Sequence, residues 1–170
     1  MNSIKGELFV LRDLAGQLIN DIDTDQIFHN QYLSIVDISK MGAYTLDNLE
    51  GYRDFAKKAK PGMIVVTGEN FGSGSSRQQA VDCFISLEMA GIVAFSYGAI
   101  YKRNAINTGF PIIEVIEIDK NILVSGKVLE FNAETGEIID DSGKVIGSCR
   151  KFSNVQKELI LKKGLLNSAE

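Results

Sequence analysis

Apolar residues in this chain occur in two patterns, short continuous runs and helical stripes, and the two patterns alternate along the sequence. Short runs rich in β-branched residues are typical of strands that are buried on both faces. Strands are predicted at residues 4–11, 63–67, 92–95 and 111–115. Residues 128–147 contain shorter runs separated by Thr-Gly and Ser-Gly steps, which favour turns. The C-terminal part is therefore expected to contain short strands joined by turns.

Helical periodicity is strongest directly after the second predicted strand. Between residues 77 and 90 the apolar positions fall on one side of a helix, and Gly91 is placed to end it in a left-handed conformation. Because strand, helix and strand follow one another with short connections, we expect a right-handed βαβ unit with 63–67 and 92–95 parallel. Further helices are predicted at residues 98–107, which Gly109 stops, and 154–163, with a weak helical pattern within 39–60. The expected fold class is mixed α/β.

Length and charge narrow the class of protein. The chain has 170 residues, of which 45% are hydrophobic, so it can bury one sizeable core, and we expect residues 1–170 to form a single domain. The net charge is −4, and no run of Lys and Arg is long enough to follow a phosphate backbone. No apolar stretch approaches bilayer length, and the N-terminus lacks the apolar segment of a signal peptide. We therefore expect a cytoplasmic protein that binds neither nucleic acid nor membrane.

Candidate metal ligands are few. Cys83 and Cys149 lie far apart in the sequence, neither belongs to a CxxC pair, and His29 is the single histidine. These residues are not expected to build a zinc site or an iron–sulfur cluster by themselves. Any metal used by this protein must then come from elsewhere, and His29 is interpreted as a loop residue.

A loop rich in glycine and serine, "GENFGSGSSR" at residues 68–77, joins the second predicted strand to the helix that follows. At such a position free N–H groups and the helix dipole favour an anion. The planar fork of Arg77 suits a carboxylate that binds through both oxygens. The alternative is that Ser76 and Gln79 form a capping box and the loop binds nothing. Phosphate-loop and dinucleotide motifs are missing, because no Gly-Lys-Ser/Thr ending and no suitably placed GxGxxG occur.

Three separately placed motifs resemble a known family. They are "DIDTDQI" at residues 21–27, "GENFGSGSSRQQAV" at 68–81 and "GIVAFSYGAIYKRNAINTGFPI" at 91–112. The sequence resembles the small subunits of the isopropylmalate isomerase group in the aconitase superfamily. The resemblance implies a swivelling β/β/α domain with a mixed sheet, which closes over a large subunit that carries a [4Fe–4S] cluster. It also implies a heterodimer or heterotetramer that acts as a hydro-lyase on a small hydroxy-dicarboxylate.

The resemblance assigns roles to residues of two motifs. Ser75 matches the catalytic base, which removes the proton next to the departing hydroxyl. Ser76 and Arg77 match residues that hold the substrate carboxylate, and Asp25 matches an acid at the active site. A serine becomes a base only where polar groups stabilise its alkoxide, and helix N–H groups beside Arg77 are expected to do so. The chain departs from the family at Ser73, where most relatives have cysteine, and we expect this change to have little effect. It also has Gln78 and Gln79 in place of the usual Glu-His, and we expect this second change to alter the hydrogen bonding around Arg77.

A second loop bears on substrate choice. In this family, the loop that begins with Tyr32 and Leu33 helps to select the variable arm of the substrate, and Ser34 and Ile35 continue it here. Relatives that accept a further carboxylate tend to place arginine at the position of Ser34. Since an unpaired buried charge is costly, this loop favours an apolar arm and hence 3-isopropylmalate dehydration in leucine biosynthesis.

Other functions stay open at this point. Within the superfamily they are a homoaconitase-like enzyme and a 2,3-dimethylmalate-type dehydratase, and outside it a non-enzymatic domain that binds a small anion. The predicted helix at residues 98–107 also offers polar side chains that either touch substrate or partner or are simply solvated, namely Arg103, Asn104 and Asn107.

Overall fold

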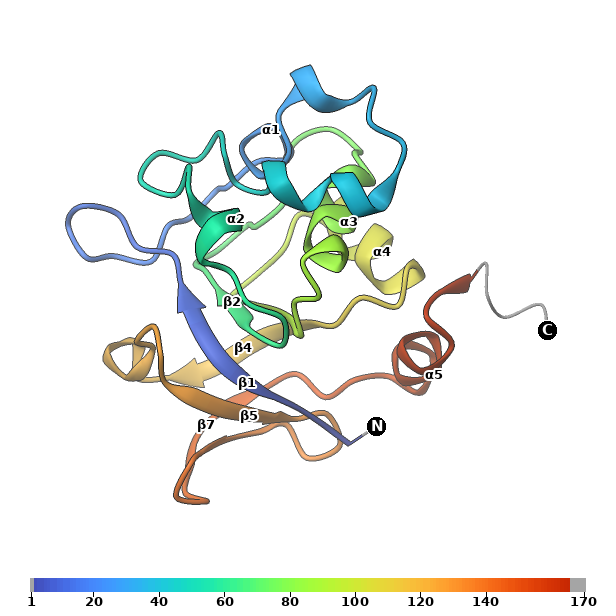
Figure 1. Ribbon diagram of the computed structural model, residues 1–170. Helices are drawn as coiled ribbons and strands as arrows, with labels where there is room; N and C mark the ends of the chain where they lie inside the picture. Colours follow the sequence, from blue (N-terminus) through green and yellow to red (C-terminus); the bar gives the residue numbers. More distant parts are fainter. Residues whose placement is uncertain (1, 166–170) are drawn as a thin grey trace.

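The computed structural model describes residues 2–165, in which seven strands close into a barrel (Figure 1). Around the barrel the strands follow the order β1, β2, β3, β4, β7, β6 and β5. Their bounds are Ser3–Val10 (β1), Ile64–Val66 (β2), Gly91–Ala94 (β3), Ile112–Ile118 (β4), Val128–Asn132 (β5), Glu137–Asp140 (β6) and Val145–Cys149 (β7). Strands β1 to β4 are parallel neighbours, and the remaining pairs are antiparallel. The mixed α/β prediction is confirmed at this level.

The helices are short, and four of them gather on the side of the barrel formed by the parallel strands (Figure 1). The α-helices are Thr24–Ile27 (α1), Phe55–Lys58 (α2), Gln79–Ser86 (α3), Ala99–Asn107 (α4) and Asn154–Lys162 (α5). The 3₁₀ helices are Asn30–Tyr32 (η1), Ile38–Lys40 (η2), Gly42–Tyr44 (η3) and Lys120–Ile122 (η4). None of the helices within residues 2–165 has the length and apolar character needed to span a bilayer.

The predicted βαβ unit is present. Strands β2 and β3 are parallel, with Val65 opposite Ile92, and α3 lies between them in the chain. The unit repeats once, because α4 connects β3 to its parallel neighbour β4. Parallel strands connected by helices direct all their carboxyl ends to one edge of the sheet, and that edge is where ligands bind in such folds.

Two apolar cores explain the runs of consecutive apolar residues. Ile64 and Val66 of β2 point into the barrel, whereas Val65 between them packs against the helices. Strand β3 divides in the same way, with Val93 inside and Ile92 outside. Both faces of these strands are excluded from water, and each such side chain contributes about 1.5–3 kcal/mol to folding. A continuous apolar run is therefore what this position in the fold requires.

One local prediction was wrong, and another was confirmed only in part. Gly91 does not end a helix: α3 stops at Ser86, Glu88 takes the left-handed conformation with φ +56°, and Gly91 opens β3. Glycine is required there because a Cβ would lie 2.8 Å from the carbonyl oxygen of Pro111 on the adjacent strand. The weak helical pattern at residues 39–60 gives only α2 and single 3₁₀ turns. In contrast, Gly109 does follow the end of α4, with φ +72°.

Candidate functional site

The glycine loop, residues 68–77, leaves the carboxyl end of β2 and runs between two other segments of the chain. On one side, the N–H of Gly72 donates to the carbonyl of Ile22 at 2.8 Å, and the N–H of Thr24 donates to Ser73 at 2.9 Å. On the other side, the N–H of Gly98 donates to the carbonyl of Phe71 at 2.9 Å. The loop therefore continues the parallel ladder past the end of the sheet, and its first half is held rigidly.

Gly72 is needed because another side chain occupies the space beside it. Its φ is +80°, and a Cβ at this position would collide with the ring of Tyr101 from α4. The Tyr101 hydroxyl donates to the carbonyl of Ala80 on α3 at 3.0 Å. One buried aromatic ring thus fixes the loop between the two helices that flank it.

Beyond Ser73 the ladder ends and the loop opens to solvent. Residues 74–76 are exposed, and across the described chain no acceptor is found for the backbone N–H groups of residues 73–79. Helix α3 begins at Gln79 with no side-chain cap. Consecutive free N–H groups before a helix are the arrangement that favours an anion.

The capping-box alternative is wrong. Ser76 does not cap α3; its Oγ accepts instead from the amide of Asn104 on α4 at 3.4 Å. The Gln79 amide donates to the carbonyl of Leu33 at 3.5 Å. Ser75 is exposed, and within residues 2–165 it has no hydrogen-bond partner. The two adjacent serines therefore do not cap the N-terminus of α3 and are available for another role.

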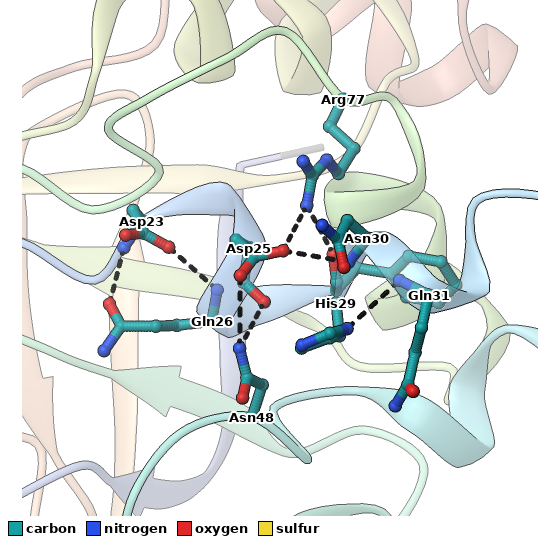
Figure 2. A network of polar contacts seen from close by, with 9 residues as sticks. Asp23, Asp25, Gln26, His29, Asn30, Gln31, Asn48 and Arg77 are labelled. Carbon is teal, nitrogen blue, oxygen red and sulfur yellow. Dashed lines mark hydrogen bonds and ion pairs between the residues drawn. The ribbon is translucent and has the colours of Figure 1, made fainter.

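Arg77 is held at one end of its guanidinium. Its Nη1 donates to Oδ1 of Asp25 at 3.0 Å and to the carbonyl of Phe28 at 2.9 Å (Figure 2). The arginine side chain is only 12% exposed, and the Asp25 side chain is 42% exposed. Nε and Nη2 have no partner in the described part of the chain, yet neither is sealed from solvent. These two donors form the edge of a guanidinium that binds carboxylates through two parallel hydrogen bonds.

Asp25 is oriented by its own surroundings. A capping box between Asp23 and Gln26 starts α1 and so places Asp25 in its first turn. Oδ1 accepts from the N–H of Asn30 at 2.8 Å as well as from Arg77, and Oδ2 accepts from the Asn48 amide at 3.3 Å. Burial acts to raise the pKa of Asp25, but hydrogen bonds from the Asn30 N–H and Arg77 outweigh it, so this pKa is lowered. The carboxylate is ionised and its oxygens face protein donors.

Asn48 was not singled out from the sequence. It lies 23 residues from Asp25, in a stretch whose pattern indicated nothing about chemistry. The Phe28 carbonyl is equally invisible to a motif search, because any residue supplies one. Contacts of this kind follow from the tertiary fold alone.

The selector loop, residues 32–36, contacts the start of α3, because the amide of Gln79 donates to the carbonyl of Leu33. Tyr32 stacks on Tyr44 with ring centroids 4.1 Å apart, and Ile35 packs against the helical core. Leu33 and Ser34 are exposed, and Val36 is 87% exposed. The loop thus presents two apolar side chains and one hydroxyl to solvent, while Tyr32 and Ile35 anchor it.

The side chains of His29, Gln78 and Gln79 form their hydrogen bonds with residues other than Arg77. His29 caps η1, with its Nδ1 accepting from the N–H of Gln31 at 3.0 Å. Gln78 donates to Asp82 at 3.0 Å, and within residues 2–165 neither Gln78 nor Gln79 forms a hydrogen bond with the guanidinium. The change from Glu-His therefore acts on α3 and on the selector loop, and the hydrogen bonds of Arg77 come from residues 25 and 28.

The donor set does not fit an iron–sulfur cluster. Over residues 2–165, no group of three or more His, Cys, Asp or Glu side chains is arranged to hold a metal ion. Both cysteines are buried, and burial raises the pKa of Cys83 to about 12 and that of Cys149 to about 11. Clusters are bound by several thiolates, so these two thiols are unsuited to the role.

Comparison with known proteins gives a consistent family. The aconitase C-terminal domain family matches residues 15–117. The 3-isopropylmalate dehydratase small subunit of Sulfolobus acidocaldarius is 36% identical over 145 residues, which cover 85% of this chain and 88% of the relative. The methanogen homoaconitase small subunit of Methanocaldococcus jannaschii is 31% identical over 159 residues, covering 93% and 90%.

A solved structure agrees with this comparison. The crystal structure of 3-isopropylmalate dehydratase from Methanocaldococcus jannaschii superposes with a TM-score of 0.81 at 30% identity, covering 97% of this chain and 92% of that chain. The fold match extends beyond the residues matched by the family, and it includes the barrel and the helices around it. The chain therefore belongs to the aconitase C-terminal domain family, in the group of isopropylmalate dehydratase and homoaconitase small subunits.

Proposed function

We propose that this chain is the small subunit of a heteromeric iron–sulfur hydro-lyase of the 3-isopropylmalate dehydratase type. In this proposal the whole chain is one cytoplasmic, swivelling domain of leucine biosynthesis, and the complex interconverts 2- and 3-isopropylmalate by dehydration and rehydration. The observation that carries the proposal is the glycine loop, where an unpartnered Ser75 lies two positions from an Arg77 that is anchored at one end and open at the other.

Arg77 binds the substrate carboxylate in this proposal. Asp25 and Phe28 hold Nη1, and Nε and Nη2 stay without a partner within residues 2–165 as a pair of donors. Ser76 and the free N–H groups of residues 73–79 add further donors on the same loop. A carboxylate bound in this way is oriented as well as attracted, because two parallel hydrogen bonds define its plane.

Ser75 is the base that removes the proton from the carbon next to the carboxylate. The negative charge that develops spreads into the carboxylate held by Arg77, so the same contacts become stronger in the transition state. The unpaired N–H groups beside Ser75 stabilise its alkoxide, which a lone serine in water could not sustain. The base and the carboxylate-binding group thus act on neighbouring atoms of one substrate.

The departing hydroxyl requires a Lewis acid, and the large subunit supplies it in this proposal as a [4Fe–4S] cluster. The residues that the structure describes, 2–165, do not fit a cluster, and their own part in the reaction is to bind the carboxylate and to move the proton. The exposure of residues 74–76 supports a site completed by a second protein, since a reactive alkoxide needs exclusion of water.

The substrate arm is assigned from the selector loop. Leu33 and Val36 are exposed, and Ser34 offers no positive charge, so a third carboxylate would be desolvated there without a partner. This favours an isopropyl or methyl arm. A homoaconitase-like function is the second candidate, because one relative at 31% identity carries that name.

The test is a reconstituted complex. The chain is co-expressed with its large subunit, the cluster is reconstituted without oxygen, and absorbance of the unsaturated product is followed with isopropylmalate, dimethylmalate and a tricarboxylic homologue as substrates. We expect isopropylmalate to give the highest kcat/KM. Preference for the tricarboxylic acid would support the homoaconitase alternative. A complex without turnover, whose isolated chain binds phosphate tightly, would support a non-enzymatic anion-binding domain.

A further inference from the structure

The side chains of Asn48, Asp25 and Arg77 come from distant parts of the sequence and contact one another in that order (Figure 2). This line of contacts ends at the Nε and Nη2 edge of Arg77, which has no partner within residues 2–165. Asn48 uses a single amide nitrogen to donate both to the main-chain carbonyl of Asp25, at 3.2 Å, and to Oδ2 of the same residue, at 3.3 Å. A donor shared between the backbone and the carboxylate of one residue restricts rotation of that side chain. Asp25 then offers its other oxygen to Arg77 in one orientation.

This restriction is needed because Asp25 is not enclosed. Its side chain is 42% exposed, so water could solvate the carboxylate in several orientations. Water would satisfy the charge, but it would not fix the plane of the carboxylate. The direction of the Nε and Nη2 edge of Arg77 depends on that plane, since Nη1 is held by Asp25 and by the Phe28 carbonyl.

Asn48 is itself placed by a firmly held segment. The N–H of Leu46 donates to the carbonyl of Ile27 at 2.8 Å, and the buried Thr45 hydroxyl lies 2.8 Å from the carbonyl of Gly42 and 3.3 Å from that of Cys83. Leu46 is fully buried with φ +58°, a conformation that bulky residues rarely adopt. Such strain persists only where the surroundings impose it, and it is found often at functional sites.

The same segment supports the selector loop. Tyr44 stacks on Tyr32, and the carboxylate of Asp47 near the Tyr32 hydroxyl raises the pKa of that tyrosine. Residues 44–48 therefore contact both the carboxylate partner of Arg77 and the anchor of the loop that faces the substrate arm. A segment that served only to connect helices would not need polar side chains aimed at both.

We propose that Asn48 is a positioning residue for carboxylate binding, acting through Asp25 to orient the free edge of Arg77. This inference rests on the proposed function, in which Arg77 binds the substrate carboxylate. Asn48 touches neither substrate nor the reacting atoms, so its loss weakens the binding of the carboxylate by Arg77 and leaves the base itself in place.

The kinetic test uses the reconstituted complex with isopropylmalate. Asn48→Ala is expected to raise KM about tenfold and to lower kcat by a smaller factor, because the contacts between Arg77 and the carboxylate strengthen in the transition state. Asn48→Asp keeps the side-chain shape but sets a second carboxylate against Asp25, so its KM is expected to rise further. Asn121→Ala, the same substitution at an exposed residue of η4, serves as the matched control and should leave both constants unchanged.

A second measurement does not depend on turnover. In the isolated full-length chain, nitrogen NMR follows rotation of the Arg77 guanidinium, with Arg77→Lys identifying the signal. Rotation is expected to become at least about fivefold faster in Asn48→Ala and to stay unchanged in Asn121→Ala. If the wild-type complex turns over but Asn48→Ala alters neither KM nor this rotation, the inference is wrong and the function stands. If no complex turns over but the rotation becomes faster, the positioning role stands and the function is wrong.

Discussion

Ser75 and Arg77 differ in how firmly the surrounding protein holds their side chains. Arg77 is fixed by Asp25 and by the Phe28 carbonyl, whereas Ser75 stands exposed with no partner anywhere in residues 2–165. A group that binds gains from being held before the substrate arrives, because the ordering cost is already met. A group that must remove a proton needs unobstructed access to the substrate carbon that carries it.

Replacing the proposed base separates catalysis from folding. Ser75→Ala is expected to lower kcat by roughly a hundredfold to ten-thousandfold, the range for loss of a general base, while KM stays within about twofold. Because Ser75 has no contact to lose among the described residues, the melting temperature should not change. Steady-state kinetics of the complex and thermal unfolding of the chain give both answers. Near-normal turnover combined with a lowered melting temperature would contradict the assignment.

Replacing the fork of Arg77 by a point charge tests carboxylate binding. Arg77→Lys keeps a positive charge near Asp25 but loses the paired Nε and Nη2 donors, so KM is expected to rise about tenfold or more. Substrate saturation curves of the complex measure the change. An unchanged KM would show that the substrate carboxylate binds elsewhere.

The selector loop allows a gain of specificity to be tested. Ser34→Arg supplies the missing partner for a third carboxylate, so kcat/KM for a tricarboxylic homologue, relative to isopropylmalate, is expected to improve about tenfold or more. Both substrates are assayed in one preparation of the complex, which cancels any effect on subunit docking. A constant ratio would mean that Ser34 does not face the variable arm.

At the level of elements, helix α3 contains a buried carboxyl group, and the charged form of that group destabilises the fold. Asp82 is 8% exposed, and burial raises its pKa despite a hydrogen bond from the Gln78 amide. The folded pKa lies above the unfolded value, so the penalty is absent at low pH and grows as pH rises through the folded pKa.

Asp82→Asn removes that penalty and keeps an oxygen that accepts from Gln78. The variant is expected to be more stable near neutral pH by roughly 1 kcal/mol, a typical size for one substitution. The difference should shrink as pH falls, because both side chains are then uncharged. Chemical denaturation at several pH values measures it. A difference that is constant with pH would contradict this account of Asp82.

The elements also show what the sequence could predict. Strands β2 and β3 were predictable because burial on both faces leaves a continuous apolar run, and the βαβ unit followed from their order. Gly91 was misread because a glycine after a helix and a glycine in close strand contact look alike in sequence. Before α2, residues 39–54 fold as short turns held by tertiary contacts such as that of Leu46 with Ile27, which no local period encodes.

The candidate site likewise has one part that the sequence could predict and another part that only the fold reveals. Ser75, Ser76 and Arg77 are consecutive, so one short motif contains all three. The ion pair between Arg77 and Asp25 spans 52 positions and exists because β1 and β2 are parallel neighbours. Asn48 had no sequence signal, since an asparagine in an irregular segment has many possible roles.

For the molecule as a whole, the parallel pairing of β1, β2 and β3 brings their carboxyl ends to one edge of the barrel. That edge carries Asp25 and the glycine loop, and residues 74–76 face outward from it. A rigid barrel that presents an open loop is suited to completing a site on another protein. The central claim is therefore that this chain provides half of an active site.

The most direct test is a titration of this chain into a fixed amount of its large subunit, with the rate of unsaturated product formed from 3-isopropylmalate as the readout. The account predicts no product from either protein alone and a rate that rises with added chain until the large subunit is saturated. With Ser75→Ala in place of the wild-type chain, the rate should stay near zero at every ratio. Product formation by the isolated chain, or none at any ratio of the two wild-type proteins, would contradict the claim.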